Sequence, residues 1–138
     1  MSSDSLAIDD VVNDAEFRAA LRQFLRRTER IARTAGLTPQ RYLLLLMIKG
    51  APDRSGRSTV TELSEQLQLA QSTVTELVAR SVEAGLIARE GSTSDARVTY
   101  LQLTPEGERR LACSFTGLEA ERSALYAAIG GLRPRAYS

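Results

Sequence analysis

The stretch Val60-Thr-Glu-Leu-Ser-Glu-Gln-Leu-Gln-Leu-Ala-Gln-Ser-Thr-Val-Thr-Glu-Leu-Val78 decides the fold, because it predicts two short helices joined by a tight turn. Thr61 or Thr59 caps the first helix, whose inner face carries Leu63 and Leu67. A turn at residues 68–70 leads to the second helix. That helix ends at Gly85, which suits a C-cap, and it buries Val74, Leu77, Val78 and Val82.

Two strand-like runs follow this helix pair. The first spans residues 86–90 and the second spans residues 98–103, where Thr99, Leu101 and Leu103 face one way. Between the runs lies Gly91-Ser-Thr-Ser-Asp-Ala96, which is rich in turn-forming residues and predicts a hairpin tip. Two helices joined by a tight turn and followed by a β-hairpin make a winged helix-turn-helix.

Further helices flank this unit on both sides. Apolar residues recur at three- and four-residue spacing over residues 9–33, which predicts one long helix ending before Gly36. A second helix begins at Thr38-Pro39, and its body at residues 42–48 is apolar on all sides, so we expect it in the core. A last helix starts at Thr104-Pro105 and runs unbroken to Gly130-Gly131. The fold class is therefore mainly α with a small β-hairpin wing (α+β).

Composition excludes several kinds of protein. The 138 residues are 43% hydrophobic, which fits one globular domain. The absence of histidine excludes Ser-His-Asp and Cys-His catalysis, and the single Cys113 excludes an internal disulfide. The polar, acidic N-terminus is unlike a secretory signal, and the longest apolar run is too short to span a membrane. We expect a soluble cytoplasmic protein that is not an enzyme and needs no cofactor or metal.

The charges are unevenly distributed. Residues 1–16 are acidic, residues 17–57 are strongly basic, and every basic residue except Lys49 is an arginine. The guanidinium fork suits phosphate contacts, although a general preference for arginine over lysine in the source genome explains the pattern equally well. One face of the first helix carries a row of arginines, for which a solvated surface is the simplest interpretation: Arg18, Arg22, Arg26, Arg27, Arg30 and Arg33.

The second helix of a helix-turn-helix lies in the DNA major groove, where its N-terminal side chains reach the base edges. Here Glu76 could accept a hydrogen bond from cytosine and Gln71 could pair with adenine. The alternative is a polar surface without a ligand. The candidate DNA-binding residues of this helix are Gln71, Ser72, Thr73, Thr75, Glu76 and Arg80.

The hairpin can extend toward the minor groove, whose narrow form attracts arginine. Arg97 is the candidate probe, and Asp95 is placed to hold it by an ion pair. The candidate wing residues are Ser92, Ser94, Asp95 and Arg97. Three further arginines lie at segment ends, where they could meet phosphates and position the protein without reading sequence: Arg54, Arg57 and Arg89.

Over roughly residues 10–130 the sequence resembles MarR-family transcriptional regulators. The resemblance lies in the order and spacing of several short segments: residues 37–46, 60–67, 72–78 and 85–89, the Asp95-Ala-Arg97 wing signature, and the pattern at residues 101–107 that opens the next helix. It implies a homodimeric transcription factor, usually a repressor, on double-stranded DNA with a pseudo-palindromic operator. It also implies a small, often aromatic effector that releases the DNA.

The resemblance also implies a division of the chain. Residues 37–104 are the DNA-binding domain, residues 9–36 and 105–131 are the helical dimerisation region, residues 1–8 are a disordered N-terminus, and residues 132–138 are a C-terminal tail. Three features depart from the family pattern. Ala70 stands where a serine cap is common, the DNA-reading helix has little positive charge, and the sixth family helix should begin near Leu132, close to the end of this sequence.

The effector site has several interpretations. A set of arginines and tyrosines could bind an aromatic acid between the dimerisation and DNA-binding parts: Arg22, Arg26, Arg41, Tyr42 and Tyr126. Core packing and surface charge are the simpler roles for most of them. Cys113 could instead sense oxidants, although a helical cysteine beside apolar residues is more often inert. A winged helix that binds a protein partner rather than DNA is the remaining alternative.

Overall fold

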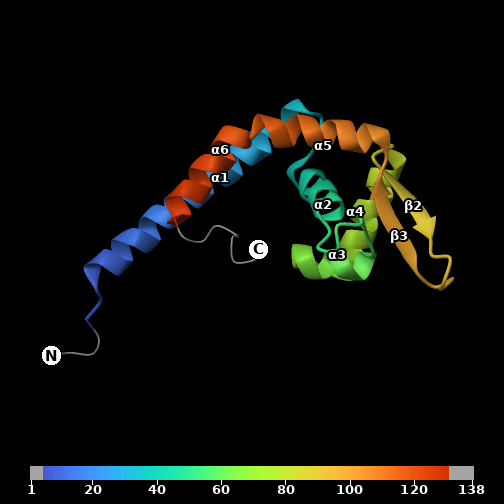
Figure 1. Ribbon diagram of the computed structural model, residues 1–138, viewed down its shortest axis with the longest axis horizontal. Coiled ribbons are helices and arrows are strands. Elements are labelled where there is room, and N and C mark those ends of the chain that lie inside the picture. The colour runs from blue at the N-terminus through green and yellow to red at the C-terminus, as the bar shows by residue number, and fades with distance from the viewer. Residues whose placement is uncertain (1–4, 131–138) are drawn as a thin grey trace.

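The computed structural model describes residues 5–130 and is mostly helical, with one small antiparallel sheet (Figure 1). In chain order the elements are α1 (Ile8–Thr34), α2 (Pro39–Lys49), β1 (Arg57–Ser58), α3 (Val60–Leu67), α4 (Gln71–Glu83), β2 (Ile87–Gly91), β3 (Thr99–Leu103), α5 (Pro105–Gly117) and α6 (Glu119–Ile129). The fold class expected from the sequence is confirmed. The expected tail at residues 132–138, the helix near Leu132 and residues 1–4 of the N-terminal segment lie outside the described residues.

Helix α2 is the centre of the core. Leu44, Leu45 and Ile48 are fully buried, and the helix contacts α1, α3, α4, α5 and the sheet. The expectation that this apolar helix is buried on most faces is confirmed, except that Leu43 remains 38% exposed. Burial on several sides explains why the sequence can place apolar residues around the whole helix.

Threonine side chains mark the starts of three helices. Thr38 and Thr104 each accept a backbone hydrogen bond at the N-terminus of α2 and α5, and a proline follows each of them. Thr59 caps α3, and Glu62 returns a hydrogen bond to the backbone of Thr59, which completes a capping box. These helices therefore begin within a residue of the positions that the local sequence predicts.

The sheet has the strand order β1-β3-β2. Strands β2 and β3 form the expected hairpin, with Ile87 opposite Leu103, and Leu101 is buried as the alternation predicts. The sequence did not predict β1, in which Arg57 lies opposite Gln102. A two-residue strand has no period of its own, so only its pairing with the distant β3 defines it.

The expectation of one unbroken C-terminal helix is wrong, because Leu118 separates α5 from α6. The backbone N–H of Leu118 and the guanidinium of Arg122 both donate to the Phe115 carbonyl, so the break leaves that carbonyl satisfied. Leu118 is almost fully buried, and Gly117 passes so close to Ile31 that an added Cβ would lie 3.1 Å from its Cγ2. Packing against α1 therefore accompanies the break.

Helices α1 and α6 run side by side as a rod that extends away from the helix-turn-helix (Figure 1). The N-terminal half of α1 leaves apolar side chains exposed, including Ile8, Val11 and Val12. Within residues 5–130, no helix is both long enough and apolar enough to cross a membrane.

Candidate nucleic-acid interface

Helices α3 and α4 pack against each other across a tight turn. Gln68 adopts the left-handed conformation, with φ of 57°, and the N–H of Leu69 donates back to Ser64 at 3.1 Å. Gln71 Nε2 donates to Thr61 Oγ1 at 3.3 Å, which ties the start of α4 to α3. The predicted helix-turn-helix is therefore present, and one of its candidate base-reading side chains already bonds within the protein.

Helix α4 has one buried and one exposed face. Val74 and Val78 lie in the core, and Ser81 is buried with its hydroxyl donating to the Leu77 carbonyl. The six candidate DNA-binding residues of the helix are all exposed: Gln71, Ser72, Thr73, Thr75, Glu76 and Arg80. The exposed face therefore offers amide, hydroxyl and carboxylate groups that could meet base edges.

The charge on this face is internally compensated. Arg80 Nη2 lies 2.7 Å from Glu76 Oε1, one helical turn away, and both side chains are 65% exposed. Arg80 is the only basic residue of α4. The two charges therefore offset each other on this face, although an exposed pair of this kind is weak and leaves other donors and acceptors of both side chains open to a ligand.

The wing tip is ordered by its own side chains. Ser92 Oγ accepts hydrogen bonds from the backbone of Ser94 and Asp95, and Asp95 accepts from the backbone N–H of Arg97. The guanidinium of Arg97 also binds the Asp95 carboxylate, at 3.2 Å, so the expected ion pair is present. These contacts hold the pKa of Asp95 below its ordinary value. The Arg97 side chain is 91% exposed, so the pair presents it to solvent at the tip.

The three candidate phosphate-binding arginines are not gathered in one place. Arg57 and Arg89 lie on strands that flank β3, opposite Gln102 and Leu101 respectively. Neighbouring residues of a strand point to opposite faces, so these two arginines lie on opposite faces of the sheet. Arg57 also stacks over the Tyr100 ring at 4.1 Å, a contact that no local sequence signal predicts. Arg54 lies in the loop before β1.

Known proteins match this arrangement. A family model described as MarR family matches residues 35–98, which contain α2, α3 and α4. The transcriptional repressor MdtR of Bacillus subtilis (strain 168) is 33% identical over 85 residues, covering 62% of this chain and 52% of that protein. A putative transcriptional regulatory protein for the hcr operon of Thauera aromatica is 35% identical over 94 residues, covering 68% and 52%. Over residues 35–98 the chain is a match to the MarR family.

Solved structures of other proteins share its fold. YusO from Bacillus subtilis superimposes with a TM-score of 0.63 at 25% identity, covering 88% of this chain and 85% of that one. A mutant MarR from E. coli complexed with operator DNA gives a TM-score of 0.65 at 17% identity, with the same coverage. The chain spans about half the length of the curated relatives it matches. The two relatives are named as regulators, in agreement with the expectation that the chain is not an enzyme.

The structure confirms the departure from the MarR pattern at the start of α4. Ala70 is the N-cap residue, its backbone is extended, and no side chain caps the helix.

We predict that Ala70→Ser stabilises the protein by about 1 kcal/mol, because a serine hydroxyl could accept a hydrogen bond from the first turn of α4. Urea unfolding measures this change. Thr59→Ala is the matched control and should lower stability by a similar amount. An unchanged midpoint for Ala70→Ser would contradict the prediction.

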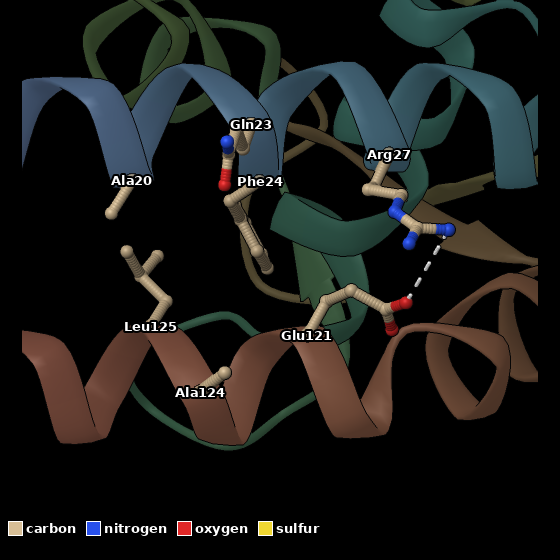
Figure 2. Close-up of a pocket in the computed structure, with 7 residues that line it drawn as sticks. All are labelled: Ala20, Gln23, Phe24, Arg27, Glu121, Ala124 and Leu125. Carbon is tan, nitrogen blue, oxygen red and sulfur yellow. Dashed lines mark ion pairs between the residues drawn. The ribbon is translucent and has the colours of Figure 1, made fainter.

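Of the five candidate effector residues, only Arg26 lines one of the grooves found among the described residues. The groove between α1 and α6 has a volume of about 210 Å³, and Arg27 and Glu121 face each other across it at 3.8 Å (Figure 2). None of the five candidates lines it. Arg26 lines a separate hollow on α1 with Gln23, Arg27 and Arg30.

The remaining effector candidates and the cysteine differ in exposure. Tyr42 is buried on α2, and burial raises the pKa of its hydroxyl, with a smaller opposing effect from Arg122. Tyr126 is 43% exposed on α6. Cys113 is exposed on α5. The five-residue effector set and the redox role of Cys113 stay predictions.

Proposed function

We propose that this chain is a DNA-binding transcriptional regulator that works as a homodimer on a pseudo-palindromic operator. The exposed N-terminal face of α4 carries the proposal, because it presents hydrogen-bonding side chains on a helix whose other face is anchored in the core. In this role α4 lies in the major groove, and the wing places Arg97 near the minor groove. The residues assigned to base reading are Thr73, Thr75 and Glu76.

The dimer is supported by the apolar side chains that α1 leaves exposed. Ile8, Val11, Val12 and Phe17 are exposed on the N-terminal half of α1, part of which extends beyond the end of α6 in Figure 1. Burying such side chains against a second copy would stabilise the pair by roughly 25 cal/mol for each Å² of apolar surface. Two copies of α4 would then meet two half-sites about one helical turn apart.

A small aromatic acid is the proposed effector class. Support comes from the solved MarR-fold neighbour NadR, whose structure is described as a complex with 4-hydroxyphenylacetate, at 22% identity and a TM-score of 0.69. Binding of such an effector to the DNA-free form would weaken operator binding by mass action. The regulator is assigned the role of a repressor, in keeping with the name of its relative MdtR.

Selection from a random duplex library at low salt tests the proposal. We expect enrichment of an inverted repeat whose half-sites are about one helical turn apart. Glu76→Gln and Thr73→Val, analysed in the same way, should enrich altered half-sites. Enrichment of no motif by the wild-type chain would overturn the proposal and favour a winged helix that binds a protein partner. An unaltered motif for both variants would remove α4 from base reading.

Arg97→Ala should weaken binding to the selected operator about tenfold or more without unfolding the domain, because the wing arginine is highly exposed and Asp95 is its one ion-pair partner within residues 5–130. Fluorescence anisotropy with a labelled operator gives the affinity, and thermal melting checks the fold. Arg109→Ala is a matched control, since Arg109 is paired with Glu106 on α5, away from the wing. Equal affinities for Arg97→Ala and the wild type would exclude the wing contact.

A further inference from the structure

Four arginines form a continuous row on α1 that the proposed base-reading surface does not use. Arg22, Arg26, Arg30 and Arg33 are spaced by four, four and three residues, so they lie on one face and follow each other at about 4.5–6 Å along the axis. We call them the α1 arginine row. All four are exposed.

The row faces away from the packed side of the helix. Thr28 and Ala32 are the buried residues of α1. Thr28 lies two positions from both Arg26 and Arg30, and Ala32 lies two positions from Arg30. Two residues correspond to about 200° around a helix, so Arg26 and Arg30, the middle of the row, lie opposite Thr28, and Arg22 and Arg33 lie about 80–140° from the two buried residues.

The row is not neutralised within residues 5–130. Two other arginines of α1 do have partners, since Arg18 pairs with Asp14 at 2.8 Å and Arg27 lies 3.8 Å from Glu121. None of the four row members forms an ion pair there, and Glu29, the one acid among them, pairs with none of them. The outer face of α1 is therefore a line of uncompensated positive charge.

We propose that the α1 arginine row binds the phosphate backbone of duplex DNA outside the half-site read by α4. Duplex DNA carries one negative charge for about every 1.7 Å of its axis, so a linear array of guanidinium groups meets a dense line of acceptors. Helix α4, the proposed DNA-reading helix, supplies no net positive charge, because its only arginine, Arg80, is paired with Glu76. Phosphate contacts dominate affinity in DNA-binding proteins, so the charge must come from elsewhere in the chain.

The α1 arginine row lies too far from α4 to share its contact with DNA. Helix α2 separates α1 from the helix-turn-helix (Figure 1), and its 11 residues span about 16 Å. The row therefore contacts a different stretch of DNA from α4 and adds affinity without adding sequence preference. The inference rests on the proposed function only in taking duplex DNA as the partner.

The test compares the wild-type chain with the variant R22Q/R26Q/R30Q/R33Q on a labelled duplex of unrelated sequence, by anisotropy over a salt series. Each phosphate contact contributes about 0.9 to the slope of log affinity against log salt, so the fourfold variant should lose about 3.6 from the magnitude of that slope. The fourfold Arg→Lys variant retains the charge and should keep the wild-type slope. The control R18Q/R27Q removes arginines that already have acidic partners and should change the slope much less.

Three results would overturn the proposal. Equal slopes for the wild-type chain and the Gln variant would show that the row makes no phosphate contact. Loss of the dimer in the Gln variant, measured by light scattering, would assign the row to contacts between copies. If R18Q/R27Q lowered the salt slope as much as the fourfold Gln variant, the effect would be due to the net charge of the protein and not to the row. Library selection separates this inference from the proposed function, because the Gln variant should enrich the wild-type motif, and the slope is measured on a duplex that needs no motif.

Discussion

Gly107→Ala is expected to destabilise the protein by roughly 3 kcal/mol, through overlap with a backbone atom. An alanine Cβ at this position would overlap the carbonyl oxygen of Leu86, a fully buried residue, and only the side chain of Leu103 could move aside. In an unobstructed helix the same substitution would stabilise the protein by about 1 kcal/mol. A lower free energy of unfolding would therefore identify the overlap with Leu86 as the cause.

The surroundings explain why the clash cannot relax. Thr104 Oγ1 accepts from the N–H of Gly107 and donates to the Gly85 carbonyl, and the N–H of Thr104 donates to the Leu86 carbonyl. Moving α5 away from Leu86 would strain or break these bonds. Urea unfolding measures the effect. Gly91→Ala is the control, since an added Cβ there meets no atom within 4 Å, and its change should stay within about 0.5 kcal/mol. A stabilised Gly107→Ala protein would refute the close approach.

Leu45→Ala should cost about 2–5 kcal/mol of folding free energy, because it removes a fully buried side chain from the helix at the centre of the core. Leu43→Ala is the matched control, since it makes the same chemical change two residues earlier on the same helix at a position that is 38% exposed. The control should cost less than about 1 kcal/mol. Chemical unfolding of both variants gives the difference. Similar costs would mean that α2 is not buried as described.

Much of the fold could be predicted because its signals are local. Thr38-Pro39 and Thr104-Pro105 mark helix starts, since the capping hydroxyl and the helix it caps lie within three residues of each other. Gly85 lies just beyond the end of α4, as the sequence predicts, and its φ of 76° is the left-handed conformation that glycine adopts after a helix. The wing ion pair joins Asp95 to Arg97, only two residues away. Each of these features depends on neighbouring residues alone.

The features that sequence reasoning missed join distant parts of the chain. Strand β1 exists only through its pairing with β3, and the Arg57–Tyr100 contact depends on that pairing. The division between α5 and α6 coincides with the burial of Leu118 and the close approach of Gly117 to Ile31, and no residue near it is a helix-breaking proline. Periodicity continues across this point, so the local pattern predicts one helix where the packed structure has two.

The candidate sites divide in the same way. The sequence determined the helix-turn-helix, the wing and the chemical character of α4, because these follow from hydrophobic period, caps and turn residues over short spans. Only the tertiary structure decided which charges are free. Arg27 lies beside Glu121 of the distant helix α6, whereas the α1 arginine row faces outward and forms no ion pair within residues 5–130. Charge compensation depends on distances between side chains of a few ångströms, and packing sets those distances.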